Sequence, residues 1–420
     1  MLTKDQKVAI DTVELAFGKG HREAALTGWA GTGKTYTTAR IVERLQGYGK
    51  VHVLAPTHRA CGVLRTEFAE AQVFVPVDTV HAGCGLIPCK QTQGVKEAGK
   101  ARADEADYII VDEASMIDGK LLARIRQLPA KRILFVGDPY QLSPVSEARG
   151  TPAFSDDTPT ARLTETKRYA PGSILDKLTA HLRDCIDTRK RPNVAKIREA
   201  MQFVDGGFEK AGELYREKEG IILGFTNRAA FEACFAVQGG AEYYFRDGDP
   251  IVFLEQWSPS GDLSDRIYNG TEAIIERQDI VHESIIKLDL KFSTGGRAEV
   301  YSYRADEMVF WMDLKKQISA RYRCTREQWE QFKKRNPIVE SLGGSDHARG
   351  KLDQINRFAF IRQTYATTCH KAQGGSYDRV IVLWDDLMKA RDPEMLARLL
   401  YVAVTRVRSA DELFFVRGAK

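Results

Sequence analysis

A run of eight residues near the amino terminus combines glycines, a lysine and a threonine at a spacing that suits phosphate binding. The run is Gly28-Trp29-Ala30-Gly31-Thr32-Gly33-Lys34-Thr35, which matches the pattern G-x-x-x-x-G-K-[ST] at every fixed position. An apolar strand before such a loop and a helix after it let backbone N–H groups and the positive helix end surround a phosphate. Lys34 is then expected to reach the β- and γ-phosphates, and Thr35 to hold Mg²⁺. The sequence therefore predicts a nucleoside triphosphate site contacted by Gly28, Gly31, Thr32, Gly33, Lys34 and Thr35.

Two carboxylates further along the chain are candidates for the same chemistry. The apolar stretch 108–111 ends in Asp112 and Glu113. In nucleoside triphosphatases the first carboxylate after such a strand completes the Mg²⁺ shell. A second carboxylate can polarise the attacking water, so the pair offers what hydrolysis needs. Asp112 is therefore expected to share the metal with Thr35, and Glu113 to act on the water.

Composition limits the classes of protein to which the chain can belong. The chain has 420 residues, 43% of them hydrophobic and 9% aromatic, which suits more than one globular domain. The net charge of +5 is compatible with a polyanionic partner but is weak support by itself. Seven scattered cysteines without a C-x-x-C pair predict reduced thiols, and no apolar run approaches the roughly 18 residues of a membrane span. We expect a protein of the cytoplasm, or of the host cytoplasm if a phage encodes it, that has no membrane partner.

The elements that must position these residues alternate along the first part of the chain. Short apolar stretches predict strands, with helical patterns between them, at 24–27, 51–55, 108–111 and 132–136. Such alternation predicts a parallel sheet with helices on both faces. Between residues 80 and 107 the pattern breaks, and we expect an insertion between two core strands. This insertion contains no aromatic residue.

Over the remainder of the chain the sequence pattern changes three times. Residues 172–218 are expected to be helical and carry a basic cluster, and residues 220–226 resemble a buried strand. From about 240 to 310, short β-like runs separated by Gly, Asp and Ser predict a small barrel or antiparallel sheet. Residues 311–360 are charged and helix-like, and 380–416 return to the α/β pattern.

Several further motifs occur in an order that fits a phosphate site. They are Pro56-Thr57-His58, Gly137-Asp138-Pro139-Tyr140-Gln141, Leu163-Thr164-Glu165-Thr166-Lys167-Arg168, Thr368-Cys369-His370-Lys371-Ala372-Gln373-Gly374 and Tyr401-Val402-Ala403-Val404-Thr405-Arg406. Together with the glycine loop, this ordered set resembles the superfamily 1 helicases of the RecD-like branch. The resemblance covers roughly residues 1–170, 220–230 and 360–417 and thins out over 240–350.

The resemblance implies an α/β fold with two RecA-like parallel-sheet P-loop domains. Domain 1 would span residues 1–170, with a small pin-like insertion at about 80–107. Domain 2 would comprise 171–238 and 358–420. A β-rich, barrel-like insertion with a charged helical extension would occupy 239–357.

It also implies roles around ATP and Mg²⁺. Gln6 matches the glutamine that reads adenine, and Gln141 matches the sensor of the γ-phosphate. Arg168 and Arg406 match two arginines that reach the γ-phosphate, where a permanently charged guanidinium suits the transition state. Gln373 and Gly374 match the block that couples nucleotide to nucleic acid. The catalytic set would be Lys34, Asp112, Glu113, Gln141, Arg168 and Arg406. Trp29 departs from the family, which usually has proline there.

A second set of residues matches the family's contacts to a single strand: Pro56, Thr57, His58, Thr79, His81, Thr368 and His370. Hydroxyls and imidazoles can bind phosphate oxygens without reading sequence, as a translocase requires. The alternative for each is an ordinary structural role, because Thr and His also cap helices.

The function implied is an ATP-dependent DNA helicase that moves 5′ to 3′ on single-stranded DNA and unwinds duplex DNA in replication, repair or recombination. Replication proteins or single-strand-binding proteins are the expected protein partners. Two alternatives stay open: a helicase acting on RNA, and an ATP-switched nucleic-acid clamp without processive unwinding.

Overall fold

The computed structural model of the 420-residue chain divides into two compact units, each described here by itself. Unit 1 comprises Met1–Phe203 and Cys369–Phe415, and unit 2 comprises Val204–Thr368 and Val416–Lys420. The structure describes residues 2–89, 94–97, 100–144, 152–155, 157–239, 245–258, 267, 269–282, 285–292, 295–305, 307–321, 325–335 and 355–418.

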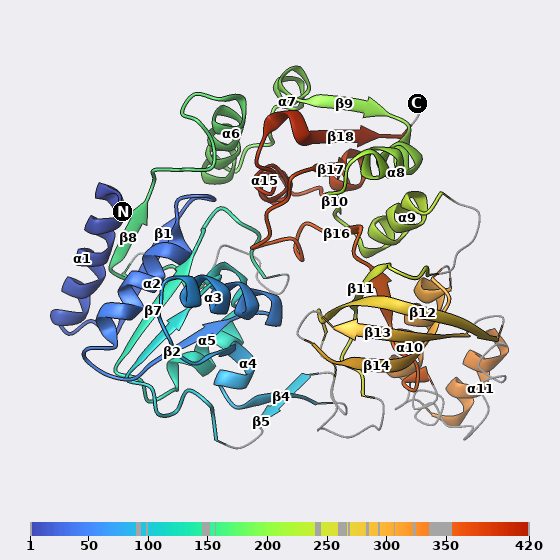
Figure 1. The fold of residues 1–420 in the computed structure, drawn as a ribbon, viewed down its shortest axis with the longest axis horizontal. Coiled ribbons are helices and arrows are strands. Elements are labelled where there is room, and N and C mark those ends of the chain that lie inside the picture. The colour runs from blue at the N-terminus through green and yellow to red at the C-terminus, as the bar shows by residue number, and fades with distance from the viewer. Residues whose placement is uncertain are drawn as a thin grey trace. The chain divides into compact units, whose positions relative to one another are not determined.

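A six-stranded parallel sheet organises the first part of unit 1, with the strand order β3-β2-β6-β7-β1-β8. Its strands are β1 (Glu23–Gly28), β2 (Val51–Ala55), β3 (Val77–Thr79), β6 (Tyr108–Val111), β7 (Arg132–Gly137) and β8 (Thr160–Leu163). Figure 1 shows the helices packed around this sheet: α1 (Lys4–Gly18), α2 (Lys34–Leu45), α3 (His58–Glu70), α4 (Val80–Gly83) and α5 (Gly119–Arg126), with a short 3₁₀ turn, η1 (Ala114–Met116).

The strands are buried on both faces because each face carries its own apolar core. On β7, Leu134 and Val136 pack with residues of α1, α2 and α3. Ile133 and Phe135, which alternate with them, pack with residues of α4 and α5. The continuous apolar runs in the sequence follow from this two-sided burial.

The four strands expected at 24–27, 51–55, 108–111 and 132–136 are confirmed to within one residue at each end. Within the predicted insertion, β4 (Leu86–Cys89) and β5 (Gly94–Glu97) form an antiparallel hairpin. Leu86, at its base, packs against the α4–α5 core. The side chains of residues 87–97 lie outside the described part of the structure.

The rest of unit 1 is built mainly from the end of the chain. Its helices are α6 (Ile174–Thr188), α7 (Val194–Ala200), α14 (Trp384–Leu387) and α15 (Pro393–Val404), with a 3₁₀ turn, η2 (Ala410–Glu412). The strands are β17 (Val380–Leu383) and most of β18 (Leu413–Arg417). The prediction of a helical 172–218 was wrong at one place, because the strand β9 (Gln202–Asp205) follows α7. Phe203 of β9 stacks on Phe415 and packs edge-on against Trp384.

Unit 2 contains a parallel strand pair and an antiparallel sheet. The pair is β10 (Ile221–Gly224) with β16 (Ala366–Thr368). The sheet has the order β14-β13-β12-β11-β15, built from β11 (Pro250–Phe253), β12 (Glu272–His282), β13 (Ile285–Phe292), β14 (Arg297–Tyr303) and β15 (Ile361–Gln363). In the described part of this unit the helices are α8 (Gly207–Glu217), α9 (Asn227–Val237), α10 (Met308–Arg321) and α11 (Arg326–Arg335). The expected β-rich insertion is therefore present, with its own apolar core around Tyr303 and Trp311.

Candidate functional site

The glycine loop has the backbone that its sequence requires. It connects β1 to α2, and Gly31 and Gly33 have φ values of 80° and 79°, in the left-handed region that favours glycine. A Cβ on Gly31 would lie 2.4 Å from Cβ of Arg168, and a Cβ on Gly33 would lie 2.6 Å from Nε2 of Gln6. Both glycines are therefore fixed by backbone conformation and by close neighbours that are themselves predicted site residues.

Lys34 lies at the start of α2 with its ammonium group turned back over the loop. Its Nζ donates to the carbonyl oxygens of Gly28 at 2.9 Å and Trp29 at 3.2 Å. These partners belong to the loop that is predicted to surround the phosphates, so the cation lies against that loop. Thr35, the next residue, is partly exposed.

Gln6 is positioned beside the same loop by the start of α1. Its side chain closes a capping box with Thr3. Its Nε2 also donates to the carbonyl of Thr32 at 3.3 Å. The buried amide therefore joins α1 to the glycine loop, a placement that suits the predicted contact with adenine.

Asp112 and Glu113 follow β6 at the carboxyl edge of the sheet. Burial, and next the neighbouring Glu113, raise the pKa of Asp112 to about 7, while Lys34 acts in the opposite direction. A buried carboxylate in this position gains from a divalent cation. The donor set of Asp112 and the Thr35 hydroxyl therefore fits Mg²⁺.

Glu113 adopts an unusual backbone conformation. Its φ and ψ of 48° and 41° lie in the left-handed region, which costs a non-glycine residue on the order of 1–3 kcal/mol. Its Oε2 is buried and has no hydrogen-bond partner among the described residues. A Cβ on Gly374 would lie 3.4 Å from Oε1 of Glu113. The structure thus brings together the two residues that the sequence assigned to water activation and to coupling.

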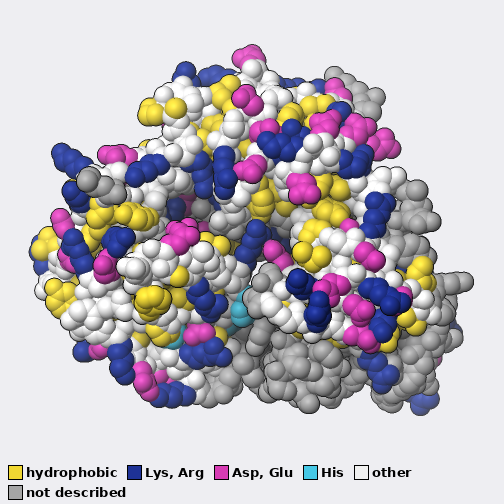
Figure 2. Space-filling view, in the orientation of Figure 1, with side chains coloured by type: hydrophobic (Ala, Val, Ile, Leu, Met, Phe, Trp, Pro, Cys, Tyr) yellow, Lys and Arg dark blue, Asp and Glu magenta, His cyan; other side chains and the backbone are white. Residues whose placement is uncertain are grey.

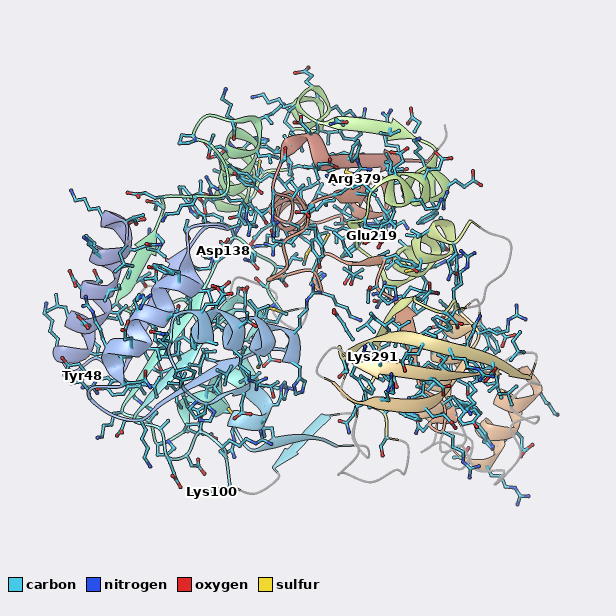
Figure 3. All side chains as sticks on the ribbon, in the orientation of Figure 1. Tyr48, Lys100, Asp138, Glu219, Lys291 and Arg379 are labelled. Atoms are coloured by element: carbon cyan, nitrogen blue, oxygen red, sulfur yellow. The ribbon has the colours of Figure 1, made fainter. Side chains whose placement is uncertain are left out.

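Gln141 lies in a tight turn directly after β7. The turn begins at Asp138 (labelled in Figure 3), whose carboxylate accepts from the backbone N–H of Tyr140 at 3.0 Å. The Gln141 side chain is only 3% exposed. Its Oε1 accepts from Nε2 of Gln373 at 3.3 Å. The predicted γ-phosphate sensor and the predicted coupling block are therefore in direct contact.

Two residues of α15 hold this turn, and neither was predicted from the sequence to have a role. Nη1 of Arg398 donates to the carbonyls of Pro139 and Gln141, each at 2.6 Å. The Tyr401 hydroxyl donates to the Asp138 carboxylate at 2.9 Å. The available signal was an arginine within the apolar run 395–404, since buried charges are rare unless they are paired.

Arg168 and Arg406 lie near one another in unit 1. Arg168 donates to the carbonyl of Thr405, and burial together with the charge of Arg406 lowers its pKa. Arg406 is 3% exposed and donates to the carbonyls of Gly375 at 2.8 Å and Val402 at 3.1 Å. The two predicted arginines thus meet beside the segment that follows Gly374.

Trp29 has a specific partner where the family usually has proline. The guanidinium carbon of Arg183, on α6, lies 3.8 Å from the centroid of its ring. This is a close cation–π stack. The departure from the family pattern thus connects the glycine loop to α6.

The predicted strand-binding residues of unit 1 begin at the ends of adjacent strands. Thr57 follows β2 and Thr79 ends β3, and Ala55 is paired with Thr79 in the parallel register. Each hydroxyl caps the helix that follows, accepting from Ala60 at 3.1 Å and from Ala82 at 3.2 Å. Both threonines therefore have the capping role that was the alternative to strand binding. The starts of the two helices lie at one edge of the sheet, where their N–H groups can bind anions.

The remaining predicted contacts differ in burial. Pro56 is partly exposed and His58 is exposed. Partial burial lowers the pKa of His81 and of His370, which favours the neutral imidazole, a form that can donate one hydrogen bond. Thr368 belongs to unit 2, at the end of β16.

Comparison with known proteins agrees with this geometry. The family model described as an AAA domain matches residues 1–200, and the UvrD-like helicase C-terminal domain matches 363–414. The ATP-dependent DNA helicase dda of Enterobacteria phage T4 is 26% identical over 99% of both chains. The chain is similar to the superfamily 1 helicases of the RecD-like branch. The ATP-dependent RecD2 DNA helicase of Deinococcus radiodurans is 34% identical over 65% of this chain and 38% of its own length.

Solved structures support the fold. The Pif1 helicase of Candida albicans superposes with a TM-score of 0.55 at 15% identity, covering 99% of this chain and 94% of its own. The α/β fold class, with RecA-like parallel sheets and a β-rich insertion, is confirmed. Within the described residues, no helix is both long and apolar enough to cross a bilayer.

Proposed function

We propose that this protein is an ATP-dependent DNA helicase that moves along single-stranded DNA and separates duplexes. The observation that carries the proposal is the presence, within one compact unit, of the glycine loop, the Asp112–Glu113 pair, Gln141 and Arg406, with the segment Gln373–Gly375 contacting Gln141, Glu113 and Arg406. The curated relatives dda and RecD2 are both named ATP-dependent DNA helicases. A Bacteroides Pif1 structure with a TM-score of 0.51 is described as a complex with ADP-AlF3 and single-stranded DNA.

The ATP site divides its tasks among residues that the fold brings together. Gln6 would hold adenine, and the loop N–H groups with Lys34 would hold the phosphates. Thr35 and Asp112 would hold Mg²⁺, which supplies charge neutralisation on the phosphate oxygens when bound. Glu113, whose buried Oε2 has no hydrogen-bond partner among the described residues, is suited to orient and deprotonate the attacking water.

Charge on the transferring phosphoryl group would be met by Arg168 and Arg406. Both guanidiniums bond to backbone carbonyls in this structure, which are partners that a γ-phosphate can replace. Gln141 would report the γ-phosphate to Gln373 through the hydrogen bond between their amides. Hydrolysis would then alter the contacts that hold Arg406, which gives the cycle two mechanical states.

The single strand would cross the edge formed by the starts of α3 and α4. Thr57, His58, Thr79 and His81 offer hydroxyls, ring nitrogens and helix-end N–H groups, which bind phosphates of any sequence. Thr368 and His370 would add the contacts of domain 2, for which we retain the boundaries 171–238 and 358–420. Movement 5′ to 3′, the pin-like role of the 80–107 insertion, and replication or single-strand-binding proteins as partners complete the proposal. The enzyme would work in the cytoplasm, that of the host if a phage encodes it.

ATP hydrolysis measured without polynucleotide, with single-stranded DNA and with single-stranded RNA tests this function. Strong stimulation by DNA of any sequence, together with ATP-dependent displacement of a strand from a tailed duplex, is the expected result. Stimulation by RNA alone would identify an RNA-directed enzyme. Stimulation without strand displacement would identify an ATP-switched clamp.

A further inference from the structure

The segment after Gly374 is fastened to Arg406 by its backbone. Nη1 of Arg406 donates to the carbonyl of Gly375 at 2.8 Å, and the N–H of Tyr377 donates to the carbonyl of Arg406 at 2.9 Å. Tyr377 also forms an isolated parallel bridge with Val407. The side chain and the main chain of Arg406 thus hold the same short segment.

Two ion pairs extend this attachment beyond Tyr377. Asp378 pairs with Arg408 at 2.9 Å, and Arg379 (labelled in Figure 3) pairs with Glu412 at 2.6 Å. Arg379 and Glu412 are mostly buried, so their pair is firmer than the exposed pair beside it. Residues 375–379 and 406–412 therefore behave as one rigid piece that contains Arg406.

The side chain of Tyr377 leaves this piece and contacts α3. Its ring folds back over the chain, so that a Cβ on Gly375 would lie 2.9 Å from its hydroxyl oxygen. That hydroxyl accepts a hydrogen bond from Nη2 of Arg59 at 3.3 Å, and the guanidinium carbon lies 5.9 Å from the ring centroid. Arg59 is the second residue of α3, directly after His58 and two residues after the N-cap Thr57.

We propose that Arg59 and Tyr377 form a positioning contact that transmits the state of Arg406 to the strand-gripping start of α3. The inference rests on the proposed helicase function and names a contact that would couple its ATP site to its DNA-binding residues. A change at the γ-phosphate that moves Arg406 must move Tyr377, because the two share backbone hydrogen bonds. Tyr377 then pulls on or releases Arg59, and with it the helix start that bears Thr57 and His58.

The contact suits a switch better than a structural support. Arg59 is exposed and Tyr377 is half-buried, so the pair can separate without opening an apolar core. A single hydroxyl–guanidinium bond plus a cation–π contact gives a modest coupling, in the range that allosteric links need. By reciprocity, a bound strand that fixes α3 would favour the position of Arg406 that hydrolysis needs.

Three variants test the contact in the full-length protein. Tyr377→Phe removes the accepting hydroxyl and keeps the ring, and Arg59→Gln removes the charge and the cation–π contact. Arg228→Gln is the matched control, because Arg228 is an exposed helical arginine whose ion pair with Glu232 lies in unit 2. For each protein, kcat is measured without DNA and with saturating single-stranded DNA, and the affinity for a fluorescent oligonucleotide is measured separately.

The proposal expects Tyr377→Phe and Arg59→Gln to keep basal kcat and to lose stimulation by DNA at least about fivefold. The double variant should lose no more than the larger single loss, because both changes break one contact. Wild-type stimulation in both single variants, or additive losses in the double variant, would overturn the proposal. Weakened oligonucleotide binding confined to Arg59→Gln, with Tyr377→Phe unaffected, would overturn it too and assign Arg59 to direct phosphate binding.

Failure of the proposed function has a different signature. If the wild-type protein hydrolyses ATP but shows no stimulation by any polynucleotide, the helicase assignment fails before the variants are compared. If the wild type is stimulated and the variants match it, only the contact is rejected.

Discussion

Lys34 is the residue on which we expect ATP hydrolysis to depend most. Its ammonium is held by two loop carbonyls, and no apolar core relies on it. Lys34→Ala is expected to lower kcat by roughly 10²–10³-fold, the cost of removing one preorganised electrostatic contact from a transition state. Steady-state hydrolysis with circular dichroism as the folding check measures this, and wild-type turnover in a folded sample would reject the site.

Arg398 is expected to affect catalysis without touching the nucleotide. It is 7% exposed and holds the turn carrying Gln141 through two carbonyls, while Glu394 neutralises its charge at 2.9 Å. Arg398→Gln should displace Gln141 and lower kcat about 100-fold, since a misplacement near 1 Å can cost that much. ADP affinity should not change, because ADP has no γ-phosphate.

Lys389→Gln, which removes an exposed charge near the same helix, is the control for Arg398. If Arg398→Gln does not fold, Tyr401→Phe removes the bond to Asp138 and a longer bond from the backbone N–H of Ala30, and it should lower kcat in the same direction. Equal losses of ADP and ATP affinity would show that α15 supports the whole site and not the Gln141 turn.

At the scale of residues, the sequence predicted those whose position in the proposed nucleotide site is set by their neighbours in the chain. Lys34 and Thr35 follow from the glycine loop because a few consecutive residues fix their geometry. The hold of Arg398 on Gln141 could not be predicted, because the two lie far apart in the chain and only the tertiary fold joins them. The strained backbone of Glu113 was also beyond the sequence, which contains no glycine or asparagine there to suggest a left-handed residue.

At the scale of elements, the β2–β3 pair predicts a pH-dependent stability. His52 is buried in β2, with Nε2 3.0 Å from the Asp78 carboxylate of β3, and burial lowers the pKa of His52 despite that partner. The unfolded chain therefore takes up this proton first as the pH falls. The stability that neutral His52 contributes is present above about pH 6.5 and is lost as the pH falls through its lower folded pKa.

Thermal unfolding between pH 5 and 8 measures this, with His52→Asn compared with His21→Asn, which changes an exposed histidine. His52→Asn should flatten the decline of the melting temperature at acid pH, whereas His21→Asn should leave it unchanged. A decline of equal steepness in all three proteins would place its cause at other groups.

The β4–β5 hairpin is predicted to act on duplexes and not on ATP. Leu86 belongs to the α4–α5 core, so a replacement should begin after it and exchange residues 87–96 for a short Gly-Ser turn. Without an aromatic residue the hairpin lacks the roughly 1–3 kcal/mol that base stacking offers, so we expect a steric wedge. DNA-stimulated hydrolysis should survive and strand displacement should collapse. Unwinding at the parental rate would mean that another element separates the strands.

Element prediction succeeded where apolar runs were long and failed where strands were short. The run 132–136 was recognised because four consecutive residues are buried on two faces. β9 and β3 have three or four residues with mixed burial, so their patterns do not differ from loops. β8 joins the sheet by pairing with β1, and its own sequence pattern does not identify it as a strand.

At the scale of the whole molecule, we expect the proposed DNA binding to depend on where the contacts lie and not on the total charge. The net charge is +5, and basic and acidic side chains are interspersed over the visible face (Figure 2). The predicted contacts in unit 1 are hydroxyls, helix ends and imidazoles whose pKa is lowered by burial. Binding to single-stranded DNA should therefore weaken as salt rises, with a slope that reflects few neutralised phosphates.

The direction of movement along DNA is a property of the whole molecule, and we predict it from the family resemblance alone. Duplexes with a 5′ single-stranded tail should be unwound, whereas those with only a 3′ tail or blunt ends should not. The reason is that a motor bound to one strand excludes the other only when it moves toward the junction. Strand displacement on the three substrates, at equal DNA-stimulated hydrolysis, measures this. A preference for the 3′ tail would reverse the polarity of the track over α3 and α4 and leave the assignment of the ATP site intact.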